Sequence, residues 1–183
     1  MAVGVKYPFG ETEGLVEKNV GTANTTYASV AEDGDNIFHR TTLSLTGALP
    51  AIAGGADLGV GRLIYTFPAG VVRVISAYFN GVAITQSEGN ITADTPDVGL
   101  GTTIASGAVA VLSGTAAFEN ILTGQTFDDC DGTGELAGAS STLIIDAADD
   151  HTVYLNVADG WAASGDAAAT ISGDVVITWE FLA

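Results

Sequence analysis

Short runs of alternating apolar and polar residues follow one another along most of the chain after residue 36. A period of two is typical of strands, because successive side chains point to opposite faces of a sheet. The clearest run is ATISGDVVITWEFLA at the C-terminus, whose apolar face holds Val175, Ile177, Trp179 and Phe181. Its other face holds Val176, Thr178 and Glu180. One apolar and one largely polar face predict a half-buried antiparallel strand.

Further runs also favour strands and are separated by turn residues, although VVRVISAYFNG is apolar on both faces. They read IFHRTTLSLT, RLIYTFPAG, VVRVISAYFNG, STLIID and HTVYLNVADGW. In RLIYTFPAG the alternation places Leu63, Tyr65 and Phe67 on one face. The dipeptide Asn80-Gly81 is a strong hairpin signal, and it predicts that VAIT pairs back onto the preceding strand. About eight to ten short strands and no amphipathic helix of ten residues predict a sandwich or barrel.

We therefore expect an all-β chain with a single antiparallel β-sandwich, jelly-roll-like, over residues 37–183. Residues 1–36 have no clean period and end in turn residues, which predicts an extended N-terminal arm. A weakly attached terminus is the alternative for this segment. Tyr7 and Phe9 of the arm are candidates for contact with a partner, because aromatic side chains on an extended segment insert well into another protein's surface.

The charge of the chain is strongly one-sided. There are 22 acidic residues against five basic ones, giving a formal net charge of −17, and no lysine or arginine follows Arg73. Binding to DNA or RNA requires cations that neutralise phosphates, so direct contact with nucleic acid is disfavoured. Attraction to an anionic membrane surface is disfavoured for the same reason. Strong like charge favours solubility instead.

Targeting and redox signals are sparse. The N-terminal residues lack the basic region and apolar core of a signal peptide, and no apolar run is long enough to span a membrane. Cys130 is the single cysteine, so the chain forms no intrachain disulfide. We expect a soluble protein that is made in a cytoplasm.

The segment PDVGLGTTIASG resembles part of a phosphate-binding loop. A dinucleotide fingerprint would need a third glycine where Ile104 stands, and a P-loop would need a lysine, but none follows Lys18. Both motifs also need a helix that opens at the glycines, whereas the next residues, AVAVLSG, favour a strand. We expect Gly99 and Gly101 to serve turns or bulges, and we expect no cofactor.

The acidic segment DDCDGTGE offers weak metal candidates in Asp129, Asp131 and Glu135. A calcium loop needs more oxygen ligands at alternate positions and a later glutamate, so a solvated acidic turn is the preferred interpretation and no metal site is predicted. Calcium shared between subunits remains an alternative. Zinc requires clustered histidine and cysteine ligands, which a single cysteine and two separate histidines do not supply.

Catalytic constellations are equally sparse. The two histidines, His39 and His151, are predicted to be structural or surface residues, and the chain has no Gly-x-Ser-x-Gly elbow. Paired carboxylates for glycoside hydrolysis depend on distances in space and stay open. We expect no catalytic residues and no enzyme activity.

Three segments carry a resemblance to a known class of proteins. They read FPAGVVRVISAYFNGVAIT, PDVGLGTTIASGAVAVLSGTAAFENILTG and HTVYLNVADGWAASGDAAATISGDVVITWEFLA. Over roughly residues 38–183 the chain resembles virion structural proteins of tailed bacteriophages, in particular small capsid decoration (cement) proteins. The resemblance implies a β-sandwich, often trimeric, on the outer capsid face, where it ties neighbouring major capsid subunits together. The implied partners are the major capsid protein and further copies of the chain.

Two alternatives remain at this point. One is a tail or head–tail joining component, which would form rings or tubes. The other is a carbohydrate-binding β-sandwich, which would present an aromatic platform and depend on calcium.

Overall fold

The described part of the chain forms ten strands. The structure was obtained as a computed structural model, which describes residues 21–35, 37–49, 58–85, 96–114, 117–126, 143–158 and 170–182. In chain order the strands are β1 (Thr22–Ala23), β2 (Ala28–Gly34), β3 (Phe38–Leu45), β4 (Gly59–Thr66), β5 (Val71–Thr85), β6 (Asp97–Gly101), β7 (Leu122–Thr126), β8 (Ile144–Ile145), β9 (Thr152–Ala158) and β10 (Thr170–Leu182). The described residues include no helix, and so none that could cross a membrane.

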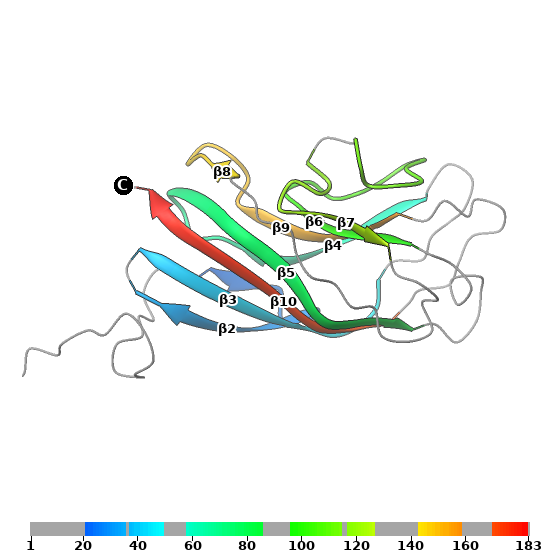
Figure 1. The fold of residues 1–183 in the computed structure, drawn as a ribbon, viewed down its shortest axis with the longest axis horizontal. Helices are drawn as coiled ribbons and strands as arrows, with labels where there is room; N and C mark the ends of the chain where they lie inside the picture. The colour runs from blue at the N-terminus through cyan, green and yellow to red at the C-terminus, as the bar shows by residue number, and fades with distance from the viewer. Residues whose placement is uncertain are drawn as a thin grey trace, which may run out of the picture.

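The strands form two antiparallel sheets of five strands each, packed face to face (Figure 1). Sheet A has the order β1-β4-β9-β6-β7, and sheet B has the order β2-β3-β10-β5-β8. This arrangement confirms the predicted all-β class and the antiparallel sandwich.

The strand pairing is nested. β6 pairs with β7, β5 with β8, β4 with β9 and β3 with β10, all antiparallel. Each pair lies outside the previous one in the sequence, and successive pairs alternate between the two sheets. The chain from β3 to β10 is therefore arranged as one long hairpin that is wrapped around the core, with β1 and β2 added at the edges.

The core lies between the sheets and contains the predicted face of β10. Val175, Ile177 and Trp179 are completely buried, and Phe181 packs partly buried against them. The opposite face holds Val176, Thr178 and Glu180, of which Val176 and Glu180 are also buried, at 3% and 5% exposure, and Arg73 of β5 pairs with Glu180. The predicted apolar face is confirmed, but the other face is less exposed than the alternation predicts.

The predicted hairpin at Asn80-Gly81 is wrong. β5 continues through both residues as one strand, and β10 pairs with it on either side. The register shifts where Gly173 of β10 meets Gly81, which has a φ of +58°. A Cβ on Gly173 would overlap the carbonyl oxygen of Gly81. The dipeptide is thus part of a bulge that bends a long strand, and pairing with β10 overrides the local turn preference.

The face predicted for β4 is also wrong in part. An irregular register between Leu63 and Tyr65 breaks the period of two, so that Ile64 and Tyr65 are both buried while Leu63 is half-buried. Tyr65 and Phe67 do lie together, with ring centroids 5.3 Å apart in an edge-to-face contact. A bulge inserts one residue into the alternation, and the sequence pattern alone does not reveal it.

The sandwich begins earlier in the chain than predicted. β1 pairs with β4, and β2 pairs with β3 over its whole length, although both strands fall in the segment expected to be an arm. Within residues 21–35 the backbone is thus part of the two sheets. The preceding part of the predicted arm lies outside the described residues.

A long connection covers the outer face of sheet A. It runs between β6 and β7 and is called the lobe here, with residues 102–114 and 117–121 described. Figure 1 shows its loops on the side of β6 and β7 that faces away from sheet B. The lobe has a small apolar cluster of its own, made by Ala105, Val109, Leu112 and Phe118 together with Ala158 of β9.

Candidate functional site

The lobe packs on a floor of glycines. Gly59 and Gly61 of β4 and Gly99 and Gly101 of β6 are all overlaid by lobe or neighbouring-strand atoms. A Cβ on Gly101 would overlap the backbone of Ala117, so the lobe approaches the sheet more closely than any side chain would allow. The glycines that resemble a phosphate loop therefore serve a bulge at Gly99 and a close backbone approach at Gly101.

Asn156 of β9 holds the lobe on this floor. It is completely buried, and its Oδ1 accepts a hydrogen bond of 2.8 Å from the Ala105 backbone N–H. Its Nδ2 donates to the carbonyl oxygens of Thr103 and Phe118, both at 2.8 Å. All three bonds are made to lobe backbone groups that have no strand partners at these points. The Asn156 side chain therefore supplies the hydrogen bonds that a neighbouring strand would otherwise supply.

Two further side chains hold the lobe in place by hydrogen bonds. Asp97 Oδ2 accepts a bond of 2.7 Å from the Leu112 backbone N–H. The Asn120 side chain accepts from the Thr102 N–H and donates to the Thr102 hydroxyl, each at 2.9 Å. These side-chain hydrogen bonds fix the position of the lobe on sheet A.

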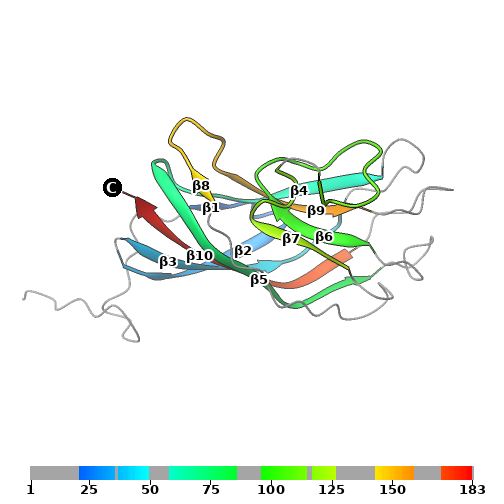
Figure 2. The same ribbon diagram turned by 45° about the horizontal axis from the view of Figure 1, so that its top comes forward.

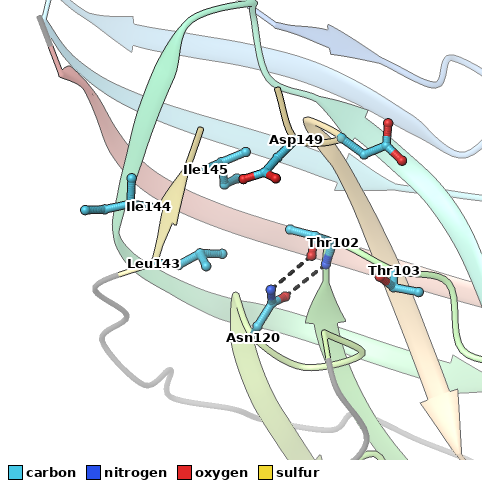
Figure 3. Close-up of a pocket in the computed structure, with 8 residues that line it drawn as sticks. Thr102, Thr103, Asn120, Leu143, Ile144, Ile145 and Asp149 are labelled. Carbon is cyan, nitrogen blue, oxygen red and sulfur yellow. Dashed lines mark hydrogen bonds between the residues drawn. The ribbon is translucent and has the colours of Figure 1, made fainter. Parts of the chain in front are cut away.

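A shallow cleft of about 270 Å³ lies between the lobe and β8 (Figure 3). Its described lining consists of Thr102, Thr103, Asn120, Leu143, Ile144, Ile145, Asp149 and Asp150. Asp149 is engaged in a tight turn, where its Oδ2 accepts a bond of 2.9 Å from the Asp146 backbone N–H. The cleft therefore offers carboxylate, hydroxyl and amide oxygens.

The chemistry of this cleft is limited. Its described lining contains no histidine, cysteine or lysine. It also contains no aromatic ring on which a sugar could stack. Over the described part of the chain, no group of three or more histidine, cysteine or acidic side chains is placed to hold a metal ion.

His151 lies beside the cleft but is engaged with backbone. Its Nδ1 lies 2.7 Å from the Pro68 carbonyl oxygen, and its Nε2 lies 3.1 Å from the Asp146 carbonyl oxygen. The ring therefore connects the β4–β5 loop to the β8–β9 turn, which agrees with the structural role predicted for it.

His39 belongs to a buried polar cluster between the sheets. Its Nδ1 lies 2.9 Å from Glu32 Oε1, and Glu32 Oε2 accepts a bond of 3.0 Å from the Tyr65 hydroxyl. The Gly21 backbone N–H donates to the Tyr65 oxygen at 2.9 Å. The His39 ring stacks on Trp179, with centroids 4.1 Å apart and planes 7° apart.

This cluster resembles a catalytic arrangement in composition, but it is inaccessible. The side chains of His39 and Glu32 are 0% and 5% exposed, and Tyr65 is completely buried. Burial, with the nearby Glu32 carboxylate, raises the pKa of Tyr65 above its ordinary range, so the phenol stays neutral. The contacts of the His39 ring come from two strands, with Glu32 on β2 and with Trp179 on β10.

The outer face of sheet B contrasts with that of sheet A. Among the described residues the cations are Arg40, Arg62 and Arg73, and the two exposed ones, Arg40 and Arg73, are on this face. Arg40 donates to the Tyr78 hydroxyl at 3.1 Å, and Arg73 pairs with Glu180. This face is the most evident candidate for contact with a partner, because it combines arginine and tyrosine with exposed apolar side chains.

Several candidates from the sequence lie outside the described residues. They are Tyr7 and Phe9 in the predicted arm and Asp129, Asp131 and Glu135 in the acidic segment. Sequence reasoning did not assign a role to Asn156, and it did not predict that Arg73 pairs with Glu180. Only the strand order reveals their roles, because their partners are distant in the sequence.

Compared with known proteins, the chain matches no family model, no curated protein and no solved structure. Its function therefore has to be inferred from its own residues.

Proposed function

We propose that the chain is a non-enzymatic structural protein of a phage virion, a capsid decoration protein that binds the outer capsid surface and stabilises contacts between major capsid subunits. The observation that carries the proposal is the nested pairing of β3 to β10. Four nested antiparallel pairs that alternate between two sheets are the strand order of a jelly roll, a fold used widely in viral capsid proteins. We interpret the sandwich as a jelly roll on this basis.

The character of the described surface supports a binding role over a catalytic one. The cleft is shallow and polar, the buried histidine cluster is closed to solvent, and the lobe is fixed by buried hydrogen bonds. A decoration protein needs a rigid module with exposed contact surfaces, and multiple weak contacts then give strong binding through effective concentration. The carbohydrate-binding alternative draws less support, because the described cleft lining has no aromatic ring.

The partners in this proposal are the major capsid protein and further copies of the chain, and the site of action is the outer surface of the virion. The predicted arm, with Tyr7 and Phe9, is proposed as one contact with the capsid. An extended segment can pair with the strands of a neighbouring subunit.

Reconstitution onto shells tests the proposal. Capsids assembled without this chain are mixed with the purified protein, and bound copies are counted against the major capsid protein by quantitative mass spectrometry. We expect saturable binding in fixed proportion to capsid subunits and a higher temperature of shell rupture. A double substitution of Tyr7 and Phe9 by alanine is expected to weaken binding while the sandwich stays folded. Absence of binding to mature shells would contradict the proposal.

A further inference from the structure

Both ring nitrogens of His151 face backbone carbonyl oxygens. Nδ1 lies 2.7 Å from the Pro68 oxygen in the β4–β5 loop, and Nε2 lies 3.1 Å from the Asp146 oxygen in the β8–β9 turn. A carbonyl oxygen only accepts hydrogen bonds, and a neutral imidazole has a single N–H, so a neutral ring makes only one of these two bonds. Both bonds form together only when each ring nitrogen carries a proton.

The loop and the turn that the ring connects are held to different degrees. On the loop side, the Phe67 backbone N–H also donates to the His151 carbonyl oxygen at 2.8 Å, next to the pairing of β4 with β9. On the turn side, β8 has only two residues, which pair with Val72 and Arg73 of β5. Figure 2 shows β8 and the turn after it at the end of the sandwich where β5 begins. The bond from Nε2 to Asp146 therefore matters most to the turn, which has the weaker attachment.

The charged groups of the segments around the ring are compatible with a protonated histidine. The turn carries three carboxylates, those of Asp146, Asp149 and Asp150. The β4–β5 loop, residues 67–70, has no titratable side chain, and Arg73, the first cation of β5, is paired with Glu180. The lobe contacts β9 at this end through Thr102, which is uncharged. These described segments therefore bring no unpaired cation to His151.

We propose that protonated His151 is a latch that fastens the β8–β9 turn to the β4–β5 loop, and that loss of one proton releases the turn. The proton on Nε2 passes to water, and the neutral ring keeps the shorter bond, from Nδ1 to the Pro68 oxygen. Nε2 then presents a lone pair to the Asp146 oxygen, and two acceptors that face each other repel. The turn moves because β9 and the loop are fixed by backbone bonds.

The latched turn forms one wall of the cleft between the lobe and β8. Asp149 and Asp150 line the cleft from this turn, and Ile144 and Ile145 line it from β8 just before the turn (Figure 3). Histidine is the side chain that ordinarily changes its charge between about pH 5 and 8. The cleft therefore has a fixed wall in mild acid and a loosened wall in mild alkali. The inference goes beyond the proposed function and does not depend on it.

Nitrogen-15 NMR of the histidine rings in the full chain tests the latch directly, because it distinguishes the imidazolium from each neutral tautomer. In a titration from about pH 5 to 8.5 we expect His151 to be doubly protonated at the acid end and to become the Nδ1–H tautomer at the alkaline end. A free neutral histidine prefers the Nε2–H tautomer, so the Nδ1–H form reports the bond to Pro68. The His151→Gln variant identifies the His151 signals against those of His39.

Hydrogen exchange at the Asp149 amide reports the state of the turn, because this N–H donates to the same Asp146 oxygen at 2.9 Å. After correction for the intrinsic effect of pH, we expect exchange there to become at least about threefold faster as His151 loses its proton. In His151→Gln the corrected rate should not change with pH. Asp149→Asn is the matched control: asparagine does not titrate, but its side-chain oxygen can still accept the bond from the Asp146 N–H, so the pH dependence should persist.

Asp149 is exposed and His151 is partly exposed, so both variants are expected to keep the wild-type circular dichroism. A wild-type His151 that becomes the Nε2–H tautomer in alkali would overturn the inference. So would an Asp149 amide whose corrected exchange rate is the same before and after the ring loses its proton. A pH dependence that persists in His151→Gln or disappears in Asp149→Asn would assign the effect to a carboxylate and would also overturn the latch.

Discussion

The two sheets present outer faces of opposite construction. On sheet A the outward positions include Gly59, Gly61, Gly99 and Gly101, and the chain's own lobe packs directly on their backbone. On sheet B the outward positions carry long side chains such as Arg40, Tyr78 and Arg73, which lie across their neighbours. The outer face of sheet A is therefore covered by the lobe of the same chain. The outer face of sheet B is covered only by its own side chains, and apolar groups stay exposed at one end of it.

This difference shows that a sheet face that contacts the chain's own backbone and a sheet face that stays exposed need different residues. A glycine floor admits backbone, and a buried asparagine then supplies the hydrogen bonds that a strand would otherwise supply. Such a face fits only the lobe, which belongs to the same chain and is therefore always present. A face of arginine, tyrosine and half-exposed apolar residues remains soluble alone and still gains from association. The predictions below separate these two kinds of surface.

The largest effect is expected for Gly101→Val on the glycine floor. The new side chain would overlap the backbone of Ala117 and Phe118, and backbone cannot move aside as a flexible side chain can. We expect a loss of about 3 kcal/mol or more in the free energy of unfolding, measured by urea denaturation. Gly114→Ala is the control, because a Cβ there meets nothing within 4 Å and only the φ of +81° opposes it, which costs about 1 kcal/mol. Equal losses for the two variants would contradict the packed floor.

The next effect concerns the side chain that holds the lobe. Asn156→Ala removes three buried hydrogen bonds and leaves the backbone groups of Ala105, Thr103 and Phe118 without those partners. We expect a loss of about 3 kcal/mol and faster hydrogen exchange at the Ala105 amide. The matched substitution on sheet B is Asn80→Ala, where an exposed amide has one contact of 3.5 Å, and it should cost less than about 0.5 kcal/mol.

The sequence predicted some features of these strands correctly and others wrongly. The alternation in the last strand predicted its buried face correctly, because each position depends only on the period of two and on which residues are apolar. The same reasoning failed at Asn80-Gly81, where a strong local turn signal is overridden by pairing with β10 on both sides. It failed again around Ile64, where a bulge shifts the alternation by one residue.

The candidate surfaces were less predictable than the strands. Asn156 occupies an outward position of an alternating strand, where a polar residue normally indicates contact with water. Its burial depends on a loop that lies some fifty positions earlier in the sequence. Arg73 and Glu180 likewise become neighbours only once the pairing of β10 with β5 is known. Charge count and periodicity carry no information about which strands become neighbours.

A smaller effect is expected on sheet B for Arg73→Gln. Glu180 is 5% exposed, and the substitution leaves its carboxylate without the cation that pairs with it. Because the arginine side chain is 46% exposed, solvent screens part of the interaction, and we expect a loss of about 1 to 2 kcal/mol. Arg40→Gln is the control, since it removes only a bond to the Tyr78 hydroxyl, and it should change stability by less than about 0.5 kcal/mol. Denaturation at dilute protein separates this loss from any change in self-association.

The smallest effect concerns the interior that both faces share, where Tyr65 of sheet A donates to Glu32 of sheet B. Burial and the Glu32 carboxylate raise the pKa of Tyr65, so the folded state keeps its phenol proton to a higher pH than the unfolded chain does. The stabilising contribution is then fully present below the ordinary tyrosine pKa of about 10 and is lost as the pH rises above it. We expect a loss of less than about 1 kcal/mol at pH 10.5 relative to pH 9, measured as the urea midpoint at each pH.

The Tyr65→Phe variant distinguishes this effect from general alkaline destabilisation. It lacks the titrating group, so its stability should fall less steeply over the same interval, although it starts lower at neutral pH because the bonds to Glu32 and from Gly21 are lost. Asn156→Ala and Arg73→Gln act on the outer faces and leave the cluster intact, so both should keep the wild-type alkaline slope. A variant of one face that changed this slope would show that the face and the interior are coupled, and the two outer surfaces could then no longer be treated as independent.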